Sequence, residues 1–159
     1  LSRILGFVRD ICIANFLGSG PVADAFFIAF KIPNLFRRLF AEGAFNASFI
    51  PLFNESLVAQ GKKGAISFAT KILSIMVAFL FLFITVIQIF MPWLMYLFAP
   101  GFSDDAEKFS LAVNLTRLTF PYLLFISLVS LLGGVLNSLG RFAAVAATPI
   151  ILNLVLILA

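Results

Sequence analysis

The sequence has no histidine, a single cysteine (Cys12) and few charged residues, which make up only 11% of its 159 positions. One cysteine excludes an internal disulfide, and the absence of histidine removes a principal ligand of zinc and haem. We therefore expect no metal, no cofactor and no catalytic residue set. The 11 lysines and arginines are scattered among apolar residues, which argues against nucleic acid as a partner.

Apolar residues dominate the chain. They make up 62% of it, with 21 phenylalanines and a mean hydropathy of +1.14, whereas soluble domains are about 45–50% apolar. Residues 72–103 carry no charge, and this run is long enough to cross a hydrocarbon core of about 30 Å as a helix. The composition predicts an all-α, polytopic transmembrane helix bundle.

Glycine, proline and polar clusters set the expected helix boundaries. Helices are predicted over residues 1–17, 21–60 with a kink at Pro33, 66–98, 106–136 and 142–159. Asp104, with Glu107 three residues later, is expected to cap the fourth helix. Because residue 1 is not methionine and the last residues stand inside an apolar run, we expect a chain truncated at both ends.

The charges of the connecting segments predict an orientation. Lys62 and Lys63 lie in one connection and Arg141 in another, two crossings later, while the alternate connections are uncharged or acidic. The positive-inside rule places residues 61–64 and 137–141 on the cytoplasmic side.

A polar stripe runs along the apolar segment between residues 24 and 46. At 100° per residue most polar side chains share a sector about 120° wide, and Arg37 falls outside it. The stripe consists of Asp24, Lys31, Asn34, Arg38, Glu42 and Asn46. An ionised residue at the centre of a spanning helix costs about 2.5–3.5 kcal/mol, which favours a water-filled cavity over lipid. A helix lying flat on the bilayer is the alternative, and the alternation of connection charges argues against it.

The first segment repeats this pattern. Arg3 and Asp10 are seven residues apart and share a face, and Arg9 lies beside them. These charges indicate a cationic pocket between the first two helices that would bind an anion, because guanidinium groups present paired donors to phosphate. Pairing or snorkelling near a membrane surface is the alternative for these residues. For Arg117, a purely packing role is equally compatible with the sequence.

Four motifs resemble those of a known family. They are SRILGFVRD (2–10), GPVADAFFIAFKIPNLFRRLFAEGAFNASFIP (20–51), APGF (99–102) and TRLTFPYLL (116–124). In this order they resemble the MurJ (MviN) family, bacterial lipid II flippases of the MOP exporter superfamily. The resemblance implies about five helices from the N-terminal lobe of a fourteen-helix, two-lobed transporter.

The resemblance also implies roles for individual residues. It matches Arg3, Arg9 and Arg37 to arginines that the family requires for substrate binding, and Asp10 to a gate acid. Asn34, Asp24 and Glu42 match cavity, gate or ion-pair positions. For one pair the arguments differ, because the straight-helix stripe favours Arg38 as a substrate-binding residue and the family match favours Arg37. We follow the family match here, because Pro33 makes a straight helical register across residues 31–38 unsafe.

The function implied is that of a flippase in the bacterial cytoplasmic membrane, not of an enzyme. It would translocate lipid II, the undecaprenyl-pyrophosphate-linked peptidoglycan precursor for the cell wall, by alternating access. Its partners would be the pyrophosphate and head group of lipid II, membrane lipid and the remainder of the transporter chain. The alternatives are a MOP-type exporter of another lipid-linked oligosaccharide or of a drug, or a membrane enzyme acting on polyprenyl phosphates.

Overall fold

The structure is a computed structural model, and it describes residues 4, 6–8, 11, 15, 18, 20–38 and 44–158. Its described part is helical and contains no strand, which confirms the all-α prediction. The elements are α2 (Pro21–Arg37), α3 (Ala44–Ile89), α4 (Met91–Phe98), the short 3₁₀ helix η2 (Pro100–Phe102), α5 (Ala106–Thr119), α6 (Tyr122–Ser138) and α7 (Phe142–Leu158).

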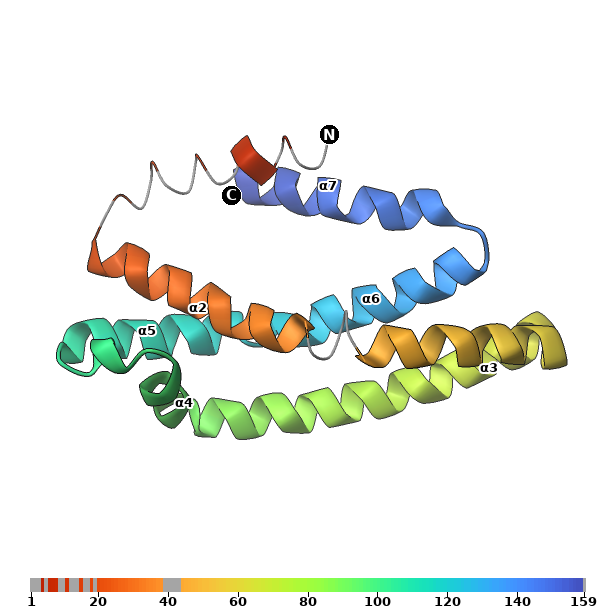
Figure 1. Cartoon of the computed structure of the whole chain (residues 1–159), viewed down its shortest axis with the longest axis horizontal. Coiled ribbons are helices and arrows are strands. Elements are labelled where there is room, and N and C mark those ends of the chain that lie inside the picture. The colour runs from red at the N-terminus through yellow and green to blue at the C-terminus, as the bar shows by residue number, and fades with distance from the viewer. Residues whose placement is uncertain are drawn as a thin grey trace.

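Helix α3 is a hairpin of two arms. Gly61 interrupts it with φ 68° and ψ −174°, a backbone conformation open essentially to glycine alone. The chain reverses at this residue (Figure 1), so that residues 44–60 form the first arm and residues 62–89 the second arm. The rings of Phe49 and Phe68 stack across the hairpin, with centroids 6.1 Å apart. The expected break at residues 61–64 is thus a one-residue turn.

Two segments are long and apolar enough to cross a membrane. They are Ala47–Ile89, which includes the hairpin turn, and Ala106–Ser138, and Phe142–Val155 is a shorter apolar helix. The turn at Gly61 and the turn between α6 and α7 lie at one end of the molecule, whereas the start of α2 and the α4–α5 connection lie at the other (Figure 1). This arrangement agrees with the alternation read from the connection charges, and the cytoplasmic orientation of the first end stays a prediction.

Several helix boundaries differ from the sequence expectation. The range 106–136 is divided at Phe120 and Pro121 into α5 and α6, and the range 66–98 is divided at Phe90 into α3 and α4. The N-cap of α5 is Asp105, whose side chain accepts hydrogen bonds from the backbone N–H groups of residues 107 and 108. The expectation that Asp104 caps this helix is therefore wrong by one residue.

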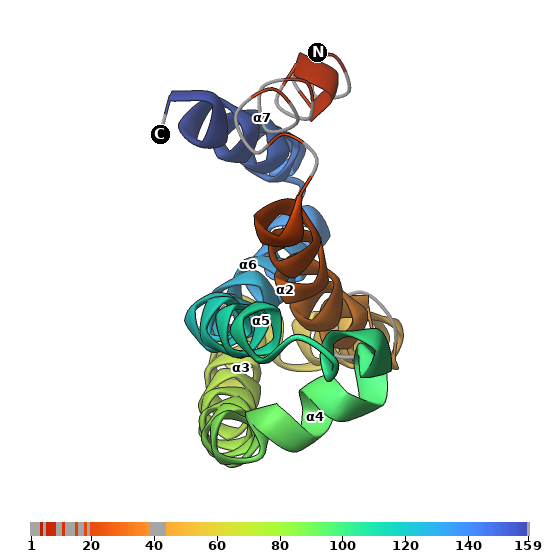
Figure 2. The same ribbon diagram turned by 90° about the vertical axis from the view of Figure 1, so that its left-hand side faces the viewer.

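Small residues let α2 pack closely on α5. Ala25 and Ala29 of α2 are fully buried, as are Ala112 and Thr116 of α5, and each pair is spaced by four residues. Such spacing places two small side chains on one helix face, which allows two backbones to approach. Viewed along the bundle, α2, α5 and α6 lie together, with the second arm of α3 and α4 beneath them (Figure 2).

An aromatic cluster joins α2, α3 and the α5–α6 junction. The ring centroid of Phe36 lies 5.4 Å from that of Phe83 and 5.6 Å from that of Phe120, and both pairs meet edge to face. Phe120 is fully buried. Edge-to-face pairs add about 0.5–1.5 kcal/mol each beyond the burial of their area. This cluster fixes the C-terminal part of α2, where the polar stripe lies.

Hydroxyl groups along the apolar helices bond to their own backbone. Thr70, Ser74 and Thr85 of α3 each donate to the carbonyl four residues earlier, at 2.8–3.0 Å. Thr116 of α5 and Ser127 of α6 do the same at 2.7 Å. These hydroxyls therefore need no partner outside their own helix.

Candidate functional site

Three residues of the polar stripe, Lys31, Asn34 and Arg38, line a cavity of about 490 Å³. Most of its wall comes from the second half of α2, and Phe98, at the end of α4, also contributes to it. The lining residues are Ile28, Lys31, Ile32, Asn34, Leu35, Arg37, Arg38 and Phe98. The cavity therefore combines an apolar wall with three cations and one amide.

Arg37 and Asn34 are joined inside this cavity. The Nε of Arg37 donates a hydrogen bond to Oδ1 of Asn34 at 3.2 Å, one helical turn away. Both side chains are half-buried, whereas Arg38 is exposed. The register of a straight helix put Arg37 outside the stripe, yet its long side chain reaches the same cavity as Arg38. The structure thus brings both arginines to one cavity, and their roles in substrate binding stay predictions.

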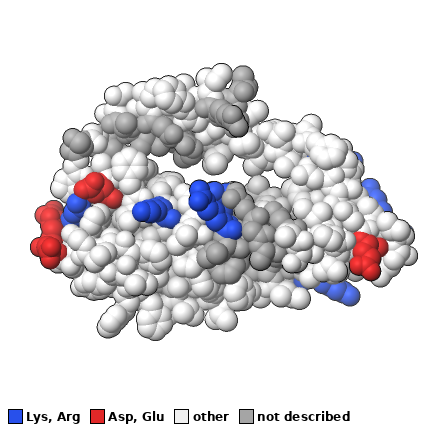
Figure 3. All heavy atoms as spheres, in the orientation of Figure 1, with Lys and Arg blue, Asp and Glu red and all other residues white. Residues whose placement is uncertain are grey.

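The described charged residues that line this cavity are all positive. Lys31, Arg37 and Arg38 line it, and no aspartate or glutamate is among its described lining residues. Lys31 and Arg38 form no ion pair with any residue in the described part of the chain. On the face shown in Figure 3, the blue groups over the middle of α2 have no red neighbours, whereas the red groups lie toward the two ends of the molecule. Such a group of cations attracts an anion.

Pro33 explains how this part of α2 is held on α5. Proline has no N–H, so it cannot bond to the carbonyl of Ala29 four residues earlier. The hydroxyl of Thr119, on α5, donates to that carbonyl at 2.8 Å. A donor from the neighbouring helix thus replaces the one that proline removes, as is required where water is absent. Helix α2 continues past Pro33 to Arg37.

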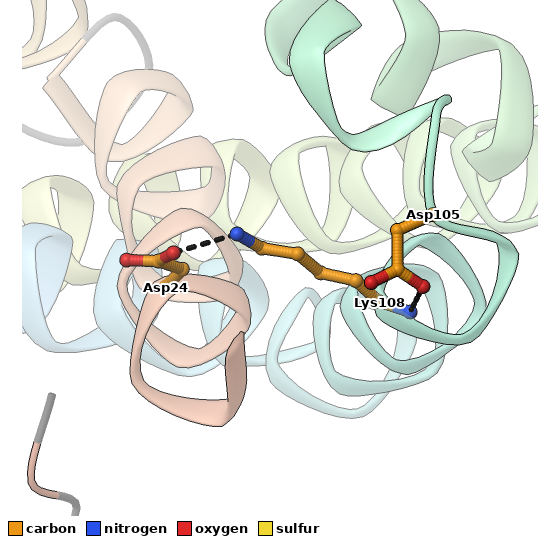
Figure 4. Close-up of polar contacts among 3 residues, drawn as sticks. All are labelled: Asp24, Asp105 and Lys108. Atoms are coloured by element: carbon orange, nitrogen blue, oxygen red, sulfur yellow. Dashed lines mark hydrogen bonds and ion pairs between the residues drawn. The ribbon is translucent and has the colours of Figure 1, made fainter. Parts of the chain in front are cut away.

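Asp24 forms an ion pair at the opposite end of α2. Its Oδ2 lies 2.6 Å from Nζ of Lys108 on α5 (Figure 4), and the Lys108 side chain is 20% exposed. The ammonium group also lies 4.4 Å from the ring centroid of Phe102. Asp105 caps the backbone of the same turn. Asp24 therefore ties α2 to the start of α5 and is not a lining residue of the cavity.

The remaining candidates from the sequence cannot be placed. Arg3, Arg9, Asp10 and Glu42 lie outside the described residues. Their roles stay predictions. Within the described part of the chain, no group of three or more metal-ligating side chains could hold a metal ion.

Sequence reasoning missed Lys108, Thr119 and Phe98. Lys108 and Asp24 are 84 residues apart, and nothing local to either residue indicates their contact. Thr119 did have a signal, because Pro33 inside an apolar helix leaves one carbonyl in need of a donor. Phe98 reaches the cavity only because α4 is separated from α3 at Phe90.

Comparison with known proteins identifies the family of this chain. The family described as Lipid II flippase MurJ matches residues 13–159. A probable lipid II flippase MurJ of Rhizobium tropici is 51% identical over 157 residues, which cover 98% of this chain and 30% of that protein. The Rickettsia prowazekii (strain Madrid E) relative of the same description is 49% identical over 158 residues, covering 99% and 31%. The lipid II flippase MurJ of Burkholderia cenocepacia is 41% identical over 164 residues, covering 100% and 31%. The chain spans about 30% of the length of these curated relatives.

Proposed function

Since this chain belongs to the lipid II flippase MurJ family, we propose that it forms part of a transporter that moves lipid II across the bacterial cytoplasmic membrane. The chain would supply spanning helices of the N-terminal lobe of a multi-pass protein that works by alternating access. The remainder of the transporter would complete the path, because the relatives are about three times as long.

The observation that carries this proposal is the cationic cavity on α2. Pyrophosphate is a compact anion, and guanidinium groups bind it with paired, charge-assisted donors. Arg37 and Arg38 provide two such groups and Lys31 a third cation, with no carboxylate among the described lining residues. A volume of about 490 Å³ suits the pyrophosphate of lipid II and part of the head group attached to it. The apolar wall separates these charges from the lipid tails.

The other polar residues would take supporting roles. Asn34 fixes the guanidinium of Arg37 through the bond at 3.2 Å, so that less side-chain freedom is lost when the anion binds. Arg3 and Arg9 would add further cations to the same cavity. Asp10 and Glu42 would act as gate or ion-pair residues. The contact of Asp24 with Lys108 supports an ion-pair role for that carboxylate.

The test is the substitution of Arg37 in the full-length protein. Arg37→Ala should abolish rescue of cells depleted of their native flippase, because it removes a charge and a forked donor from the cavity. Arg37→Lys keeps the positive charge but not the paired donors of the guanidinium group. Partial rescue by this variant would therefore assign the remaining loss of growth to the missing bidentate geometry. Arg3→Ala and Arg9→Ala are expected to fail in the same assay.

A matched control is Lys63→Ala, which removes a cation from the exposed turn of α3, away from the cavity. This variant should rescue growth at the same level of membrane-inserted protein. Full rescue by Arg37→Ala, Arg3→Ala and Arg9→Ala would overturn the proposal. Accumulation of a chemically altered polyprenyl phosphate, in place of transport, would favour the membrane-enzyme alternative.

A further inference from the structure

A second cavity lies between the two arms of α3, at the end of the molecule opposite Asp24. Its volume is about 320 Å³, and both arms contribute to its wall. The lining residues are Leu52, Glu55, Ser56, Ala59, Gln60, Gly64, Ser67, Phe68 and Lys71. None of these residues takes part in the cationic cavity on α2.

The two charged groups of this second cavity have opposite signs and do not form an ion pair. Glu55 comes from the first arm and Lys71 from the second. Neither forms an ion pair with any residue in the described ranges. Oγ of Ser56 is buried and has no hydrogen-bond partner there. A buried hydroxyl without a partner is destabilising, and a ligand atom would supply the missing hydrogen bond.

The position of Lys71 along the second arm places the cavity at the level of lipid headgroups. Ile89, where α3 ends, lies eighteen positions after Lys71, and at 1.5 Å per residue the two are about 27 Å apart along the helix. The hydrocarbon core of a bilayer is about 30 Å thick. Because residues 72–103 are uncharged, the helix between these points fits the core, and Lys71 stands at its edge.

We propose that this cavity binds the headgroup of a zwitterionic aminophospholipid, of the phosphatidylethanolamine type. The Lys71 ammonium would bind the phosphate, with the hydroxyl of Ser56 as a further donor. The Glu55 carboxylate would bind the lipid ammonium. A purely anionic headgroup would leave Glu55 uncompensated and repelled, so both charges of the cavity are satisfied only by a ligand that carries both signs. This lipid is a bound component of the protein, distinct from any transported substrate.

The experiment measures thermal unfolding of the full-length protein in mild detergent with added lipids of matched acyl chains. Phosphatidylethanolamine should raise the melting temperature most, since a ligand that binds the folded state stabilises it. Phosphatidylglycerol has no ammonium group for Glu55, and the quaternary ammonium of phosphatidylcholine has no N–H to donate to that carboxylate, so both should raise it less. Glu55→Gln should weaken the apparent affinity for phosphatidylethanolamine about tenfold and abolish the preference over phosphatidylglycerol. Lys71→Gln should weaken the response to both lipids, and Glu55→Asp should retain the preference.

Two controls separate this proposal from others. Lys63→Gln removes a cation from the same hairpin outside the cavity and should keep the full lipid preference. Arg37→Ala should also keep it, so this proposal and the proposed transport function fail separately. Equal stabilisation of the unsubstituted protein by the three lipids would overturn the proposal, as would an intact preference in Glu55→Gln. An equal shift with soluble glycerophosphoethanolamine would overturn the assignment to a membrane lipid.

Discussion

Thr119→Val tests how α2 is held at the point where its helical hydrogen bonding is interrupted. The substitution keeps the size and branching of the side chain and removes its donor. The carbonyl of Ala29, a fully buried residue, then loses the hydroxyl at 2.8 Å, and Pro33 cannot replace it. Thr119 also contacts the carbonyl of Thr116 at 3.2 Å, but that acceptor keeps the N–H of Phe120 at 2.8 Å. The loss is thus confined to one acceptor.

The expected cost follows from this single acceptor. Leaving a buried carbonyl unsatisfied costs about 1–3 kcal/mol, whereas side-chain hydrogen bonds between membrane helices average about 0.6 kcal/mol. We expect Thr119→Val to lower the free energy of unfolding by about 1 kcal/mol. Thr119→Ser retains the donor and should stay close to the unsubstituted protein.

A double-mutant cycle with Pro33→Ala gives the decisive measurement. Alanine at position 33 restores an N–H for the carbonyl of Ala29, so Thr119→Val should then cost only a few tenths of a kcal/mol. The assay is reversible unfolding of the full-length protein in mixed micelles, followed by circular dichroism. An equal cost of Thr119→Val in both backgrounds would refute the reasoning, because the hydroxyl would then not be replacing the donor that Pro33 lacks.

Three further outcomes are expected in the same unfolding assay. Asp24→Asn and Lys108→Gln should show a coupling of about 0.5–1 kcal/mol that shrinks in 1 M salt, since the pair is partly exposed; additive effects would contradict a direct contact. Gly61→Ala should destabilise by about 1–3 kcal/mol, because its φ of 68° and ψ of −174° suit glycine alone, and an unchanged stability would contradict that conformation. Asp105→Ala should cost about 1 kcal/mol through loss of the α5 cap, whereas Asp104→Ala should be nearly neutral, and the reverse order would restore Asp104 as the cap.

Local pattern was enough to predict the helical class and to place three polar residues of α2 on one face. Lys31, Asn34 and Arg38 line one cavity, as their shared sector indicates. A uniform 100° step gives the direction of a Cβ atom but not the reach of a long side chain, which is why the straight-helix register placed Arg37 off the stripe. The break at Phe120 and Pro121 was also readable in principle, since proline disfavours a continuous helix at the residue before it.

Contacts between distant segments could not be predicted in the same way. The pairing of Asp24 with Lys108 depends on how α2 and α5 cross, and the sequence around either residue is compatible with several partners. The cap of α5 shows the same limit at short range. Asp104 and Asp105 are both suitable side chains, and the backbone of residue 105, with φ −123° and ψ 103°, decides between them.

The hydroxyls that bond to their own helix in α3, α5 and α6 affect how easily these helices can move relative to their neighbours. Thr70, Ser74 and Thr85 already use their protons within one turn of their own backbone. None of these hydrogen bonds has to break when the helix shifts along a neighbouring helix or through the surrounding acyl chains. Serine and threonine at these sites therefore do not hold one helix to another. When a helix shifts, the bonds that must break are hydrogen bonds between helices, such as the one from Thr119 to the carbonyl of Ala29.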